Sequence, residues 1–269
     1  MNSYYIHFTP LNDRLVKNLP VLLRGGLSPK VVCESSAEPT LLERASSRLQ
    51  NSSQVNMLLA QHVSTIYPHL KANLLQLSPG LLFDDVHLSR SFLRSTLSPS
   101  ISTIEHTCQH IYCLKDSLLS ADNSPILVLE DDALPITPNF LKLLHAIFSQ
   151  PFLHNDAPFM IDLGQGLGLK SENQNIASNH SIERVKDGRT RCSFAYMLSS
   201  AACRQIVDLV EQSHFLPYLP SDWYLSLLTT VLGIPTYWSV LPIFSQGSET
   251  GIVKSNQSSR TGQRMMPAH

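Results

Sequence analysis

A four-residue aliphatic run that leads directly into three acidic residues constrains this fold more than any other stretch. The run Ile126–Leu129 follows Pro125 and is too short for a buried helix, but it suits a strand covered on both faces of a parallel sheet. Glu130, Asp131 and Asp132 follow at its carboxyl end. Open α/β sheets bind ligands at this end of their strands, so the stretch predicts a central strand and a candidate site together.

The three carboxylates predict a cation site. Side chains alternate along a strand, so we expect Glu130 and Asp132 on one side and Asp131 on the other. Two neighbouring carboxylates repel each other unless a cation lies between them. With no cysteine or histidine at ligand spacing beside them, we expect oxygen ligands, which favour Mn²⁺ or Mg²⁺ and a nucleotide diphosphate. The alternative is a plain acidic turn before a helix that has Thr137 as N-cap and Pro138 as first residue.

The rest of the chain predicts an α/β fold with a mostly parallel central sheet flanked by helices. Tyr4–Phe8 and Val31–Cys33 have strand character, and the helix between them ends at Gly25 and Gly26, which predicts a β-α-β opening of a nucleotide-binding half. Phe159–Leu163 and Phe194–Leu198 are further strand candidates. The 269 residues, of which 43% are hydrophobic, suffice for one domain over residues 1–255, and we expect a disordered polar tail at 256–269.

Composition excludes several classes of protein. The net charge is −1 and the chain has no basic cluster of the size that a phosphate backbone requires, so no nucleic-acid partner is expected. The five cysteines include no Cys-x-x-Cys pair, which argues against a zinc cluster and a disulfide framework and favours a reducing compartment. We find neither a signal peptide nor a transmembrane run, and expect a cytoplasmic protein that can rest on the inner membrane surface through its acceptor.

Three polar residues outside the acidic stretch are candidates for function, and each also has a structural interpretation. Arg14 follows the first strand and would lie near the phosphates, unless it is a solvated helix residue. His110 lies at the edge of the apolar face of a helix that starts at a Ser102/Glu105 capping box, where most histidines are structural. Asp222 precedes a helical stretch and is either a functional carboxylate or the N-cap of that helix.

In this order, these features resemble glycosyltransferase family 25, the group of lipopolysaccharide-biosynthesis and collagen-type galactosyltransferases with an A-type, Rossmann-like glycosyltransferase fold. The resemblance spans about residues 4 to 256. Its landmarks are Ile6–Phe8 with Arg14, the helix with His110, Leu129–Asp132, Phe194–Ser199 with Ala202, Pro220–Asp222, and Gln246 with Ser248. His7 replaces the family's asparagine, the glycine-cysteine pair that precedes the family histidine is missing before His110, and residues 34–100 match no landmark.

The resemblance implies the inverting transfer of a hexose, most often galactose from UDP-galactose, to a hydroxyl of a glycan such as lipopolysaccharide. A cation held by Glu130 and Asp132 would neutralise the charge that develops on the departing diphosphate. The residues implied in donor binding are Arg14, Asp131 and Gln246.

A carboxylate opposite the donor would deprotonate the acceptor hydroxyl, and Asp222 is the first candidate for this base, with His110 as the next. Two other functions stay open at this point. A metal-dependent phosphoryl transferase or hydrolase could use the same acidic strand end, although the sequence shows no Walker lysine or aspartyl nucleophile. A degenerate transferase could also persist as a non-catalytic sugar-binding protein.

Overall fold

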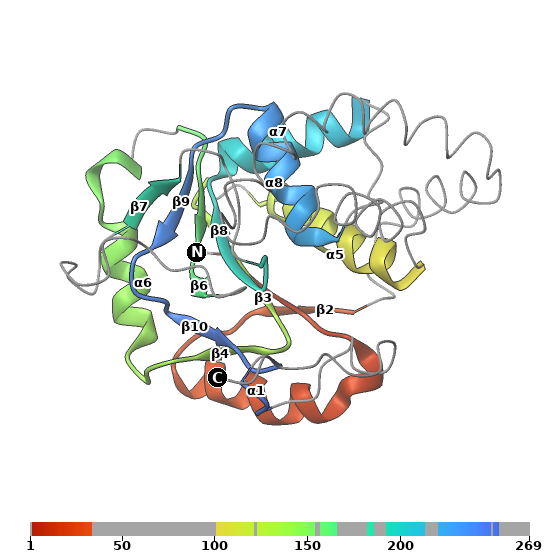
Figure 1. Cartoon of the computed structure of the whole chain (residues 1–269), viewed down its shortest axis with the longest axis vertical. Coiled ribbons are helices and arrows are strands. Elements are labelled where there is room, and N and C mark those ends of the chain that lie inside the picture. Colours follow the sequence, from red (N-terminus) through yellow and green to blue (C-terminus); the bar gives the residue numbers. More distant parts are fainter. Residues whose placement is uncertain are drawn as a thin grey trace, which may run out of the picture.

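A computed structural model of the chain describes most of the predicted elements. The described residues are 2–33, 101–120, 123–153, 157–165, 182–185, 192–212, 220–248 and 250–252. Residues 34–100 and the predicted tail, 256–269, lie outside them. The described residues form a central sheet with helices on both faces (Figure 1).

The central sheet has seven strands in the order β2-β1-β3-β8-β5-β9-β7. Their bounds are β1 Ser3–Ile6, β2 Lys30–Val32, β3 Ile126–Glu130, β5 Met160–Asp162, β7 Ile182–Val185, β8 Ala195–Leu198 and β9 Thr236–Ser239. Strands β2, β1, β3, β5 and β9 run in one direction, whereas β8 and β7 run in the other. The expected α/β fold with a mostly parallel sheet is therefore confirmed. The antiparallel β8 beside β3 was not predicted, because strand periodicity carries no information about direction.

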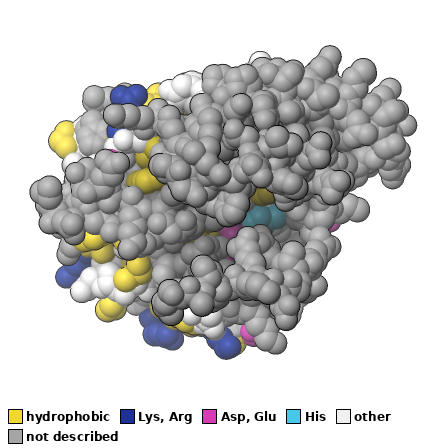
Figure 2. Space-filling view, viewed as in Figure 1, with side chains coloured by type: hydrophobic (Ala, Val, Ile, Leu, Met, Phe, Trp, Pro, Cys, Tyr) yellow, Lys and Arg dark blue, Asp and Glu magenta, His cyan; other side chains and the backbone are white. Residues whose placement is uncertain are grey.

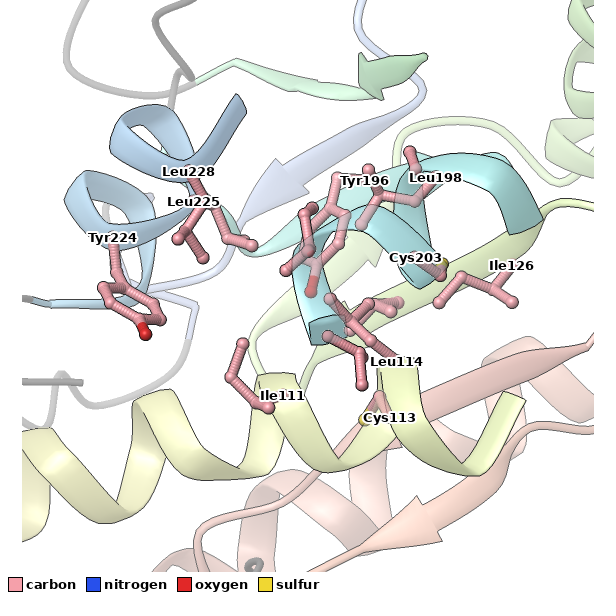
Figure 3. Close-up of a cluster of buried hydrophobic side chains, with 14 of the residues drawn as sticks. Ile111, Cys113, Leu114, Ile126, Tyr196, Leu198, Cys203, Tyr224, Leu225 and Leu228 are labelled. Atoms are coloured by element: carbon pink, nitrogen blue, oxygen red, sulfur yellow. The ribbon is translucent and has the colours of Figure 1, made fainter. Parts of the chain in front are cut away.

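The five α-helices of the described residues form the outer layers. Helices α5 (Ile101–Ser117), α7 (Ser200–Gln212) and α8 (Ser221–Val231) cover one face of the sheet, and α1 (Asn12–Arg24) and α6 (Phe140–Phe148) cover the other (Figure 1). On the first face, Ile111 and Leu114 of α5 lie close to Tyr196 of β8 (Figure 3). Short 3₁₀ turns occupy Thr9–Leu11 and Pro151–Leu153. No helix in the described residues is both long and apolar enough to span a membrane.

The alternation of side chains along β3 decides where the acidic residues point. Ile126 and Val128 belong to the core under α5, α7 and α8, and Leu127 and Leu129 belong to the core under α1 and α6. All four side chains are buried. The same alternation carries Glu130 to the α5 face. It directs the side chain of Asp131, in the turn after β3, toward α1.

A small second sheet lies beyond the end of β3. It consists of β4 (Ala133–Pro135), β10 (Phe244–Gln246) and β6 (Gly164–Gln165), with β10 in the middle. Strand β4 therefore separates the acidic turn from α6. The predicted Thr137/Pro138 helix start is wrong, because α6 begins at Phe140 with Asn139 as its N-cap.

Two helix boundaries follow from local chemistry. Helix α1 ends at Gly25 and Gly26, and Gly26 takes the left-handed backbone conformation, with φ of 91°, that glycine adopts without strain. Ser199 caps α7, because its Oγ accepts a hydrogen bond of 3.1 Å from the backbone N–H of Ala202.

Candidate functional site

Asp131 is buried and joins the acidic turn to β1 and α1. Its Oδ2 accepts hydrogen bonds from the backbone N–H of Phe8 and from Nδ1 of His7, both at 3.0 Å. Its Oδ1 lies 2.6 Å from Nη1 of Arg14. Its backbone carbonyl accepts a further hydrogen bond of 2.7 Å from Asn18. The carboxylate is therefore fully used in holding the first helix and strand against the turn.

These contacts change the interpretation of two residues that the resemblance places at the donor. Arg14 is not a solvated helix residue, since it is buried and paired with Asp131. Sequence reasoning missed His7 and Asn18 as partners in this network. His7 falls at the end of β1, and only the pairing of β1 with β3 brings it to the turn.

Glu130 lies against two histidines of α5. Its Oε1 is 3.2 Å from Nε2 of His106 and 3.3 Å from Nε2 of His110, and the two Nε2 atoms are 3.4 Å apart. The histidines are four residues apart and so occupy the same side of the helix. His110 is fully buried, and its Nδ1 is hydrogen bonded at 2.8 Å to the hydroxyl of Tyr196 on β8.

The charges in this cluster depend on one another. Burial by itself raises the pKa of Glu130, but the two histidines outweigh it and hold that pKa well below its usual range. Burial lowers the pKa of His106, but the Glu130 carboxylate outweighs it and raises that pKa to about 9. Burial lowers the pKa of His110 below its ordinary value. At neutral pH the cluster therefore holds an anionic glutamate, a cationic His106 and a neutral His110.

Asp132 has a different environment from the other two acids. It is only 4% exposed, and its Oδ2 accepts a hydrogen bond from Ser248. Its Oδ1 is buried and has no hydrogen-bond partner among the described residues. Burial, and then the nearby charge of Glu130, raise the pKa of Asp132 to about 6. A buried carboxylate oxygen without a donor fits a hard cation such as Mn²⁺ or Mg²⁺.

A second set of possible metal ligands lies at the same end of β3. His106, His110 and Glu130 offer one ligand atom each within 4.8 Å of one another, and Asp132 is not part of this cluster. The two histidines approach Glu130 because α5 packs over the face of the sheet to which β3 directs that side chain. The spacing of four residues on a predicted helix was a signal in the sequence that could have revealed the pair.

Gln246 lies beside the acidic turn. In the small sheet its register partner is Ala133, the residue after Asp132. The next residue, Gly247, donates a backbone hydrogen bond of 2.7 Å to the carbonyl of Asp132. Residues 246–248 thus lie against Asp132 and the residue after it.

The N-cap interpretation of Asp222 is wrong. Helix α8 begins at Ser221 with Pro220 as its N-cap, and Asp222 lies in the first turn. The hydroxyls of Ser221 and Ser193 are 2.8 Å apart, and the carbonyl of the residue after Ser193 accepts a hydrogen bond from the backbone N–H of Glu130. These hydrogen bonds connect the start of α8, through residues 193 and 194, to the end of β3 where the acidic turn begins.

The region is accessible from one face of the molecule. Figure 2 shows a histidine side chain and acidic side chains next to each other in a hollow on that face. In the histidine-glutamate cluster, the side chain of His106 is 35% exposed and that of Glu130 is 17% exposed. Molecules in solution can therefore reach part of the cluster.

Comparisons with known proteins add no family to this geometry. No protein-family model matches the chain, and no curated protein matches it. The contacts of the site residues are therefore what bears on function.

Asp131→Asn should destabilise the protein by about 3–5 kcal/mol, because it leaves the buried charge of Arg14 without its carboxylate. Urea denaturation monitored by circular dichroism would measure the loss. Asp13→Asn is the matched control, because Asp13 is an exposed acid of α1 whose carboxylate lies 4.0 Å from Nζ of the exposed Lys17. We expect the control to change stability by less than about 0.5 kcal/mol. Equal losses in the two variants would contradict the central role of Asp131.

Asp132→Asn should raise the free energy of unfolding, and only at higher pH. The pKa of Asp132 is about 6 in the folded protein and 3.8 ordinarily, so ionisation favours the unfolded state as pH rises between these values. Asparagine has no proton to lose. The variant should therefore match the wild type near pH 4 and exceed its unfolding free energy by about 1–3 kcal/mol at pH 7.5. Denaturation in EDTA at both pH values tests this, and a stability difference that does not change with pH would refute it.

Proposed function

We propose that the chain is a cation-dependent inverting glycosyltransferase that moves a hexose from a nucleotide sugar to a sugar hydroxyl. The observation that carries this proposal is Asp132, a buried carboxylate whose Oδ1 has no hydrogen-bond partner among the described residues. It follows Glu130 at the carboxyl end of a central strand, where α/β sheets bind nucleotides. Two carboxylates at this position fit a cation that in turn binds a diphosphate.

The sheet supports the same proposal. The parallel unit β1-α1-β2 lies directly beside β3, so the carboxyl ends of these strands meet next to the acidic turn. We propose that this arrangement is the nucleotide-binding half of an A-type glycosyltransferase fold. The resemblance described above favours UDP-galactose as donor and a glycan such as lipopolysaccharide as acceptor.

Glu130 and Asp132 are the residues that would hold Mn²⁺ or Mg²⁺, which neutralises the negative charge of a departing diphosphate. Asp132 would bind through its buried Oδ1. Ser248 orients this side chain by donating a hydrogen bond to the other oxygen. Asp131 stabilises the turn through its contacts with Arg14 and Phe8. Its neighbours Glu130 and Asp132 would face the ligand.

Asp222 is the candidate base in this proposal. Its carboxylate would take the proton of the acceptor hydroxyl while the hydroxyl oxygen bonds to the anomeric carbon and the bond from that carbon to the diphosphate breaks, with inversion. His110 suits this role less, because it is fully buried and its two ring nitrogens already face Tyr196 and Glu130. Asp222 is half-buried, at the start of a helix tied to the same edge of the sheet.

Donor binding should depend on the cation. In calorimetry with Mn²⁺, UDP-galactose should bind at least roughly tenfold more weakly to Asp132→Asn than to wild type, which corresponds to about 1.4 kcal/mol. EDTA should weaken wild-type binding in the same way, because without a cation the carboxylates face the diphosphate as like charges. Donor affinity that changes with neither EDTA nor the substitution would rule out the proposed function of the acidic turn.

Asp222→Asn should separate chemistry from donor binding. The amide cannot accept the proton, so turnover should fall by roughly 10²- to 10⁴-fold while donor affinity stays near wild type. Stability should change by no more than about 1 kcal/mol, the usual contribution of an acid in the first turn of a helix.

The matched control for this test is Asp13→Asn, because Asp13 lies in the first turn of α1 as Asp222 lies in that of α8. Release of UDP with and without an acceptor would follow the reaction. The control should keep wild-type turnover. Wild-type turnover in Asp222→Asn would show that another group is the base.

A further inference from the structure

We propose that His106, His110 and Glu130 form a binding site for a borderline divalent transition metal such as Zn²⁺, with a fourth coordination position left for an oxygen ligand. This inference goes beyond the proposed transferase function. The ligand set shares Glu130 with the proposed Mn²⁺ site, but it contains two imidazoles, does not include Asp132 and requires no nucleotide.

The spacing of the three ligand atoms fits tetrahedral coordination. Glu130 Oε1, His106 Nε2 and His110 Nε2 form a triangle with sides of 3.2, 3.3 and 3.4 Å. Zinc binds nitrogen and carboxylate oxygen at about 2.0–2.1 Å, so adjacent ligands of a tetrahedral site are roughly 3.3–3.4 Å apart. Neighbouring ligands of an octahedral Mg²⁺ site at about 2.1 Å would be closer, at roughly 3.0 Å. The triangle therefore matches the tetrahedral ion better.

Secondary structure holds the three side chains in place. The histidines project from the same side of α5, and Glu130 ends β3 beneath that helix. The hydroxyl of Tyr196 lies 2.8 Å from Nδ1 of His110. When Nδ1–H donates to this hydroxyl, Nε2 carries the lone pair that a metal ligand needs. Such outer partners orient metal-binding histidines in known sites.

The chemistry of the ligands selects the class of ion. Imidazole nitrogen suits Zn²⁺ and its neighbours in the first transition series, whereas Mg²⁺ and Ca²⁺ prefer oxygen. Three protein ligands with an open fourth position are typical of zinc sites that bind water or substrate. The exposed part of His106 gives the ion a route from solution.

The same contacts would also satisfy a metal-free ion pair between Glu130 and a protonated His106. The two states differ in one measurable property, which is stoichiometric metal binding. The full chain, freed of metal with a chelator, should be titrated with Zn²⁺ by calorimetry in the absence of any nucleotide sugar. Co²⁺ should be added in parallel, since its visible absorption reports tetrahedral coordination.

We expect one Zn²⁺ per chain at this site and an intense Co²⁺ absorption band. Tyr196→Phe should weaken zinc binding by roughly 10–100-fold, the usual loss when an outer partner is removed. His106→Ala removes a ligand and should weaken zinc binding more than Tyr196→Phe does. His106 is partly exposed, so this variant should stay folded, which circular dichroism would check. Tyr196→Phe is an independent test, because phenylalanine keeps the shape of the side chain and lacks only the hydroxyl.

One control should keep wild-type zinc affinity. His145→Ala removes an exposed histidine of α6 and measures adventitious binding. Absence of stoichiometric binding, or equal binding in His106→Ala and wild type, would overturn the proposal. Glu130 belongs to both proposed sites, but the zinc test alters His106 and Tyr196 and the donor test alters Asp132, so the two proposals can fail separately.

Discussion

The buried ion pair between Asp131 and Arg14 is the interaction on which the site depends. A charge inside a protein is costly unless it is paired and hydrogen bonded, and Asp131 meets this condition with Arg14, His7 and the backbone of Phe8. Arg14 belongs to α1, and His7 and Phe8 belong to the segment between β1 and α1. The pair therefore holds the first β-α unit against the acidic turn and sets the positions of the acids on either side.

Three consecutive acids consequently have three different environments. Asp131 is neutralised by an arginine, and Glu130 faces two imidazoles, which keep it ionised. Asp132 keeps a buried oxygen without a hydrogen-bond donor among the described residues, and its pKa rises to about 6. An ionised carboxylate beside one whose ionisation is unfavourable is an arrangement that a bound cation would stabilise.

The antiparallel strand β8 connects the core to this chemistry. Tyr196 pairs with Val128 of β3 in the sheet, and its hydroxyl reaches His110 beneath α5. The backbone carbonyl just before β8, from Phe194, accepts a hydrogen bond from Glu130. One strand thus orients both a histidine and the glutamate that it contacts. Strand β8 therefore couples the packing of the hydrophobic core to the geometry of the site.

The sequence by itself determined the elements, because their signals are local. The aliphatic run before Glu130 predicted β3, its alternation predicted that Glu130 and Asp131 diverge, and Gly25 with Gly26 marked the end of α1. Tertiary structure alone decided the partners. Arg14 is 117 residues from Asp131 and Ser248 is 116 from Asp132, and no local pattern encodes contacts over such separations. The direction of β8 and the approach of His106 to Glu130 likewise depend on how strands pair and how α5 packs, which is set by the whole core at once.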